Sequence, residues 1–448
     1  MPPARTRPIA NRALAQAIKD AGWTHATTAA RINAAAAEHG SPLYYDRSAV
    51  GHWLTGTTPM PEAVTAAVTA FRRGLGRPDL TAADLGWQQV SQAGAGDNPW
   101  DGDPVARLAT LGEDDVLNRR SLLSAVAFTT AGLVPPGRPR PAAPPTGGRR
   151  GGAGDVDRLR ATTAVFADLD DRYGGGHARA AVAAYLSREV APLLHGTTGP
   201  ARTPLFRAAG ELTYLAAYMA MDAGAPDLAI RYYIATIRLA DEVGDRALRA
   251  TGLRSMAVLA AESGRHAEAM DCAEAAASAL GSHGPARTRA WVTGMRAEAH
   301  AGIGGRWDAL DLLRRAETLV ERADSPPEAM WTGAYRRESL QHQTGLTLTA
   351  LGDHSTAAGH YAASMDSRRP IEQRTRALIG LRAAHAHLLS GQIEQAAATV
   401  LTLGPGLRSI VSARVQAELR RVRAGWQPYR GNAQIADADR QITEHVLS

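Results

Sequence analysis

Apolar and polar residues follow one another along most of the chain at the spacing of helices. In residues 47–54, Val50, Trp53 and Leu54 recur at i, i+3 and i+4, so that one face of this segment is apolar. Few segments show the alternation of a half-buried strand. Aromatic residues make up only 5% of the chain and alanine is abundant, which suits closely packed helices. The pattern therefore predicts an all-α fold.

Two of the predicted helices lie near the N-terminus, the first ending near Glu38 and the second covering residues 47–54. Thr24 and Asp46 stand where a side-chain oxygen can accept from the free backbone N–H groups of each first turn. Opposite the apolar face of the second helix, the side chains are short or basic. These residues are Arg47, Ser48, Ala49 and His52. Such a face can enter the major groove of DNA, which is about 12 Å wide.

This segment resembles the helix-turn-helix of the Xre and lambda-repressor-like family. The resemblance is carried by GWTH from Gly22, the small Ala29, RSAVGHW over residues 47–53, and Gly56 with the TTPMP that follows it. It implies that His25 lies near a phosphate and that the short and basic residues named above face double-stranded DNA. The seven residues HGSPLYY between the helices are a departure, because the family usually has three or four there. A helical domain that docks a protein is the alternative.

Beyond residue 200 the sequence repeats itself. A glycine followed five residues later by an alanine occurs five times, at intervals of 40, 40, 48 and 39 residues. Glycine permits a bend between two helices, and the small alanine lets the second helix lie close to the first. The glycines are Gly224, Gly264, Gly304, Gly352 and Gly391. The pattern resembles the tetratricopeptide repeat, which implies an α-solenoid whose concave face binds a peptide or a partner's helix.

Aromatic and basic residues of the repeats are candidates to line this concave face, the arginines offering charge for a carboxylate. The effector-groove candidates are Tyr214, Tyr218, Tyr233, Arg254, Trp291, Arg296, Trp331 and Tyr335, with Tyr232, Tyr361 and Arg336 as further members. Helical spacing does not say which face looks inward. For each aromatic residue, a place in the repeat core is therefore the alternative.

Four regions are predicted. They are a helix-turn-helix domain over residues 1–80, a connector and apolar helix over 81–134, a Pro/Gly-rich linker over 135–155, and the repeat domain over 156–448. Asp168, Asp170, Asp171 and His177 flank a run of three glycines and could be read as a metal cluster. Acidic residues before a glycine turn are common without a metal, so no metal or other cofactor is predicted.

The formal net charge is +6, and its distribution is uneven. Residues 1–80 hold nine basic and five acidic groups, whereas residues 81–104 hold four acidic groups and no basic one. Because the excess is modest, phosphate contacts would be few in one subunit, and a homodimer is expected to bind DNA. The single cysteine, Cys272, fits a reducing cytoplasm, and no signal peptide or membrane span is expected.

No zinc-protease motif, nucleophile turn or phosphate-binding loop is found, so the chain is not expected to be an enzyme. The order of its parts resembles a group of actinobacterial transcriptional regulators. The sequence thus predicts a dimeric, sequence-specific DNA-binding regulator whose repeat domain senses a peptide, small-molecule or protein effector. A protein-interaction scaffold whose N-terminal helices dock a protein partner is the competing interpretation.

Overall fold

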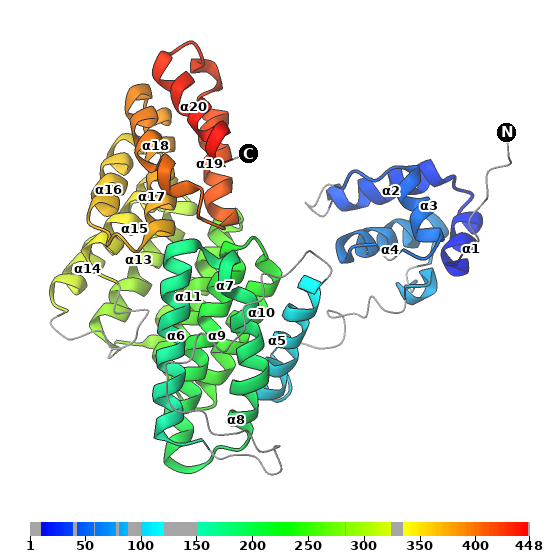
Figure 1. Cartoon of the computed structure of the whole chain (residues 1–448), viewed down its shortest axis with the longest axis horizontal. Helices are drawn as coiled ribbons and strands as arrows, with labels where there is room; N and C mark the ends of the chain where they lie inside the picture. The colour runs from blue at the N-terminus through cyan, green and yellow to red at the C-terminus, as the bar shows by residue number, and fades with distance from the viewer. Residues whose placement is uncertain are drawn as a thin grey trace. The chain divides into compact units, whose positions relative to one another are not determined.

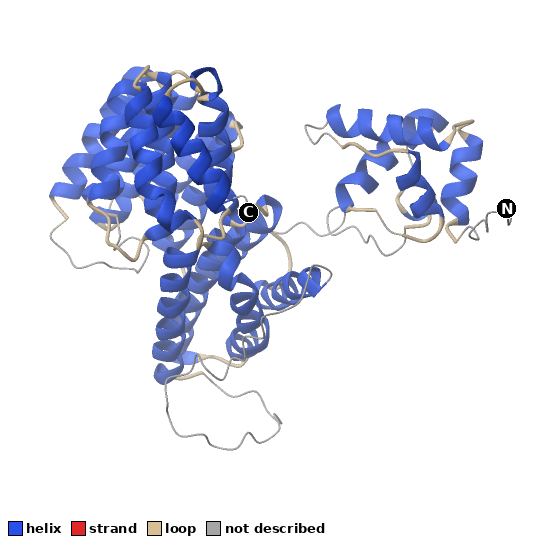
Figure 2. Ribbon diagram, turned by 45° about the horizontal axis from the view of Figure 1, so that its top comes forward, coloured by secondary structure: helices blue, strands red, loops and turns tan. Residues whose placement is uncertain are grey.

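The computed structural model describes residues 10–38, 43–57, 59–77, 80–87, 100–120, 151–282, 284–323 and 335–446. All regular secondary structure in these residues is helical, which confirms the all-α prediction (Figure 2). The chain divides into two compact units, Met1–Asn98 and Pro99–Ser448. Each is described by itself.

In the residues that the structure describes, the first unit has four α-helices and a short 3-10 helix around one core. The elements are α1 (Arg12–Asp20), α2 (His25–Glu38), α3 (Arg47–Leu54), α4 (Pro61–Leu75) and η1 (Ala83–Leu85) (Figure 1). Helix α2 packs against both α3 and α4. The predicted apolar positions Val50, Trp53 and Leu54 are buried in this core.

The core of this unit continues beyond the predicted boundary at residue 80. Leu85 and Trp87 are buried in it, and the Trp87 ring meets the Trp53 ring edge-on at a centroid distance of 6.2 Å. Asn11 secures the segment, because its amide donates to the Leu85 carbonyl at 2.9 Å while its carbonyl oxygen caps α1. The sequence from residue 81 to Trp87 thus belongs to the first unit rather than to a connector.

The second unit is a longer succession of helices. They are α5 (Pro104–Arg120), α6 (Ala153–Tyr173), α7 (Gly175–Tyr185), the π-helical turn η3 (Leu186–Val190), α8 (Ala191–His195), η4 (Gly199–Ala201), α9 (Arg202–Asp222), α10 (Pro226–Asp241), α11 (Arg246–Glu262), α12 (His266–Leu280), α13 (Ala286–Gly302), α14 (Arg306–Glu321), α15 (Arg337–Ala350), α16 (His354–Asp366), α17 (Gln373–Leu389), α18 (Ile393–Leu407), α19 (Ala413–Gly425), η6 (Gln427–Tyr429) and α20 (Ala433–Val446). Successive helices pack as pairs from α9/α10 to α17/α18.

The glycine and alanine of each predicted repeat lie where the pattern indicated. All five glycines stand in the turn between two paired helices with φ between 72° and 83°, a conformation that side chains with a Cβ rarely adopt. The five alanines are fully buried where the second helix crosses the first. They are Ala229, Ala269, Ala309, Ala357 and Ala396. Small residues at these crossings allow the paired helices to approach closely.

Helix α5, from the predicted connector, packs onto the second unit against α7, η3 and α10. A buried ion pair of Asp115 with Arg179 holds it there, and the Tyr232 hydroxyl donates to the Asp115 carboxylate at 3.2 Å. The apolar segment from residue 121 to 134 and most of the predicted linker lie outside the described residues. Of the helices within the described ranges, none has the length and apolar character needed to cross a bilayer.

A glycine turn between α6 and α7 joins the two ends of the second unit. The Gly175 amide donates to Asp222 at 2.9 Å, and the Gly176 amide donates to the Val411 carbonyl at 3.1 Å. Gly174 has φ +88°, and a Cβ there would lie 2.7 Å from the same carbonyl. Only glycine fits this close approach, so the first helices of the unit lie against the segment that leads into α19.

Candidate functional site

Helix α3 presents the predicted short and basic residues outward. Asp46 caps it, since one carboxylate oxygen accepts from the amides of Ser48 at 2.9 Å and Ala49 at 3.1 Å. Arg47, Ser48 and His52 are exposed, and Ala49 is half-buried. The predicted cap and the two-sided character of this helix are confirmed, whereas contact with DNA stays a prediction.

The start of α2 and the residues just before α3 are held by side-chain hydrogen bonds. Thr24 accepts from the Thr27 amide at 3.1 Å, as predicted, and His25 is exposed at the first turn. The Asn33 amide donates to the Tyr45 carbonyl at 2.8 Å, and the Tyr45 amide donates back to Asn33 at 3.0 Å. This reciprocal pair fixes the residues just before α3 against α2, which compensates for the length of the turn.

Two large side chains near α3 are exposed although they are partly or wholly apolar. Tyr44, two residues before the cap, is 89% exposed, and Met60, before α4, is 64% exposed. Arg47 forms no ion pair with any described residue. A basic side chain and an aromatic side chain are therefore both accessible at the beginning of α3.

The second unit contains a half-open cavity of about 570 Å³, lined by helices from both of its ends. Six of the eight predicted effector-groove residues line it. These are Tyr214, Tyr218, Tyr233, Arg254, Trp291 and Tyr335. Arg296 instead donates to Glu274 at 2.8 Å and is absent from the lining, and Trp331 lies outside the described residues. Tyr232 and Tyr361 are core residues, as the alternative interpretation anticipated.

One wall of the cavity is aromatic. The rings of Tyr214 and Tyr233 lie 5.8 Å apart, and those of Trp291 and Tyr335 lie 6.4 Å apart. The Arg254 guanidinium stands over the Trp291 ring, 4.4 Å from its centroid. Among the described residues, the buried hydroxyls of Tyr233 and Tyr335 have no hydrogen-bond partner. This wall therefore combines apolar surface with unused hydrogen-bonding groups.

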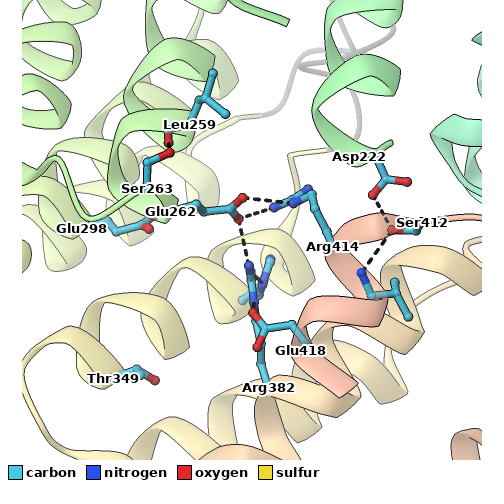
Figure 3. A network of polar contacts seen from close by, with 12 residues as sticks. Asp222, Leu259, Glu262, Ser263, Glu298, Thr349, Arg382, Ser412, Arg414 and Glu418 are labelled. Carbon is cyan, nitrogen blue, oxygen red and sulfur yellow. Dashed lines mark hydrogen bonds and ion pairs between the residues drawn. The ribbon is translucent and has the colours of Figure 1, made fainter. Parts of the chain in front are cut away.

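Another part of the lining is an ion-pair network centred on Glu262 (Figure 3). Its carboxylate accepts from the Arg382 guanidinium at 2.8 Å and from Nε of Arg414 at 3.0 Å. Arg382 also bonds Glu418 at 3.1 Å. Burial alone raises the pKa of Glu262, but Arg414 and Arg382 together lower it to about 2. Glu262 is thus a permanent anion that joins α11, α17 and α19.

Further ion pairs extend this part of the lining toward α6. Arg374 donates to Asp170 at 3.1 Å and to the Tyr218 hydroxyl at 2.9 Å. Burial raises the pKa of Asp170 to about 7 against the opposing effect of Arg374. His177 stacks on Tyr173 at 4.8 Å. Asp170 and His177 therefore have other partners, and no cluster of metal-ligating side chains occurs in the part of the chain that the structure describes.

The ion pairs of the lining were missed by the reasoning from sequence. Glu262 and Arg414 are 152 positions apart in the chain, and Asp170 and Arg374 are 204 apart. Residues so far apart in the sequence form no short-range pattern from which either ion pair could have been predicted. The only signal was the run of three glycines, which marks the turn where the two ends of the unit meet.

Part of the first unit is similar to a known family. Residues 14–88 match a family model described as the SP15 N-terminal domain. The match begins within α1 and ends one residue beyond Trp87, so it coincides with the core of the first unit. No curated protein matches the chain.

Proposed function

We propose that this protein is a sequence-specific DNA-binding transcriptional regulator that acts in the cytoplasm as a homodimer. Its first unit would be a helix-turn-helix of the Xre and lambda-repressor-like type. Its second unit would be a tetratricopeptide-like solenoid that dimerises and binds an effector. The observation that carries the proposal is the outward face of α3, where Arg47, Ser48 and His52 are exposed on a capped and firmly anchored helix.

The chemistry of this face suits the major groove. The small Ser48 and Ala49 permit close approach, while Arg47 and His52 can donate to base edges or phosphates. Only a few phosphate contacts fit on so short a helix, so two copies are needed for useful affinity.

Regulation follows from linkage between the two units. An effector that binds one conformation of the second unit more tightly than another shifts the protein toward it by the difference in binding free energy. The cavity supplies the place for that effector. If the two conformations hold the DNA-reading units of the dimer at different spacings, operator affinity changes with effector concentration.

Selection of bound sequences from random DNA tests this proposal. Purified full-length protein should enrich an inverted repeat whose half-sites are one helical turn apart, about 10 base pairs, or a multiple of it. Affinity for the enriched sequence should fall steeply between low and moderate salt. Enrichment of no sequence, both with and without a cell extract that supplies effectors, would contradict the proposal.

A protein-interaction scaffold is the second candidate, and the exposure of Tyr44 and Met60 favours it. Exposed aromatic and methionine side chains are typical of surfaces that dock protein partners. Salt separates the two functions. Docking through apolar side chains would depend weakly on salt, whereas binding to phosphates depends on it strongly.

A further inference from the structure

Arg254 differs from every other arginine in the cavity. The lining contains seven arginines, and six of them form an ion pair with an Asp or Glu side chain. Arg254 forms none with the residues that the structure describes. It donates one bond to Gln343 at 3.1 Å, and its Nε is buried without a hydrogen-bond partner. Arg254 is half-buried, and the nearby Glu298 carboxylate is linked to it through Gln343 rather than by a direct ion pair. Its remaining N–H groups therefore favour an anion supplied from outside.

The groups around Arg254 indicate what that anion is attached to. Its guanidinium carbon lies over the Trp291 ring, 4.4 Å from the centroid, and the N–H groups not bonded to Gln343 can donate to a ligand. The hydroxyls of Tyr233 and Tyr335 are also buried without a partner among the described residues. Burial raises the pKa of both phenols well above the ordinary value, so both keep a proton to donate. The ligand therefore needs several acceptors and a flat apolar body.

The size of the cavity limits the ligand further. Sites for small molecules and cofactors occupy about 300–1,000 Å³, and this cavity of about 570 Å³ lies within that range. A molecule of one or two rings fits such a volume. Arg382 already pairs with Glu262, and Arg374 already pairs with Asp170. The ligand therefore needs only one anionic group.

We propose that the cavity binds a small organic carboxylate with an aromatic body, its carboxylate on Arg254 and its ring against Trp291 and the neighbouring tyrosines. This inference rests on the proposed effector-sensing function and specifies the chemistry of the effector. Because ligand binding is measured without DNA, failure of the DNA experiment leaves this inference standing, and the converse also holds.

The test compares aromatic carboxylates with their uncharged amides on the full chain. Indole-3-acetate and phenylacetate are titrated beside indole-3-acetamide and phenylacetamide, and binding is followed by calorimetry. We expect at least one acid to bind about tenfold or more tightly than its amide, since a charge-assisted hydrogen bond is lost in the amide. Inorganic phosphate serves as a control anion that has no aromatic ring. The proposal is overturned if each acid and its amide bind alike, or if phosphate binds better than every acid.

Variants connect this preference to the proposed residues. Arg254→Gln should abolish the preference for the acid, and Arg254→Lys should keep part of it. Tyr335→Phe removes only the hydroxyl and should weaken binding of the acid several-fold. The matched control is Tyr361→Phe, because the Tyr361 hydroxyl bonds Thr349 at 3.0 Å outside the cavity lining. Circular dichroism checks the fold of each variant. If folded Arg254→Gln still prefers the acid, Arg254 is not the carboxylate site.

Discussion

Arg414 and Arg254 line the same cavity, yet their surroundings are opposite. Arg414 shares the Glu262 carboxylate with Arg382, so all three charges are satisfied within the protein. Arg254 lies on an aromatic ring with a single amide acceptor, and two buried phenols line the same wall. The ion pairs around Glu262 hold the helices together, whereas the groups around Arg254 include hydrogen-bond donors that have no partner among the residues that the structure describes. Buried polar groups that lack partners are therefore the better guide to a ligand site.

The largest effect should come from breaking the ion-pair network around Glu262. Glu262→Gln leaves Arg382 and Arg414 without their shared counter-ion. We therefore expect the free energy of unfolding, measured in urea, to fall by about 3 kcal/mol. The control is Glu268→Gln, whose carboxylate is mostly exposed and pairs with Arg265, the N-cap residue of α12. It should change stability by less than about 0.5 kcal/mol. Equal stability of both variants would show that the Glu262 network does not hold the helices.

Low pH should weaken the ion-pair network around Glu262. The pKa of Glu262 in the folded protein is lowered from 4.5 to about 2. Its contribution is therefore fully present above about pH 4.5 and is lost as the pH falls toward 2. The stability difference between wild type and Glu262→Gln should shrink below pH 4.5 by up to about 1.4 kcal/mol for each pH unit. Urea unfolding between pH 6 and pH 3 measures this, and a difference independent of pH contradicts the assignment.

A smaller effect is expected in the first unit, where Asn33 plays a comparable holding role. Asn33→Ala removes both bonds to the Tyr45 backbone, and we expect a loss of about 1–2 kcal/mol. Hydrogen exchange of the α3 amides in the full chain should accelerate accordingly. Gln16→Ala is the control, because its bond to Asp20 is exposed. Unchanged protection of α3 in Asn33→Ala would mean that packing alone fixes the turn.

The smallest effect should distinguish paired from unpaired hydroxyls. Tyr233→Phe removes a buried hydroxyl that has no partner among the described residues, so thermal stability should be unchanged or slightly higher. Tyr361→Phe removes a bonded hydroxyl and should cost about 1 kcal/mol. Thermal unfolding of the two variants side by side checks this order. A clear loss in Tyr233→Phe would reveal a structural role for that hydroxyl.

The elements predicted correctly are those whose defining residues lie close together in the sequence. The caps Thr24 and Asp46 stand within three residues of the amides they bond, and the glycines of the repeats lie five residues from the alanines they accompany. The cavity was anticipated through its aromatic residues and through Arg254 and Arg336. Its ion pairs join helices far apart in the chain, and a helical period does not tell which partner a carboxylate will meet after folding.

The first unit shows the same limit at its boundary. The acidic and glycine-rich composition after residue 80 indicated a connector, but Leu85 and Trp87 are buried and complete the core. Two apolar residues in a polar stretch produce no recognisable period. Their burial follows from contacts with Asn11 and Trp53, which lie far upstream in the chain.

The most direct test of the proposed function is a titration of the selected DNA sequence with wild type, Arg47→Ala and Arg12→Ala. Arg12 is an exposed arginine on α1, so its removal subtracts the same charge from the same unit. If α3 reads DNA, Arg47→Ala should weaken binding about tenfold or more, and Arg12→Ala should weaken it only slightly. Equal affinity of wild type and a folded Arg47→Ala variant would contradict the central claim that this face of α3 recognises DNA.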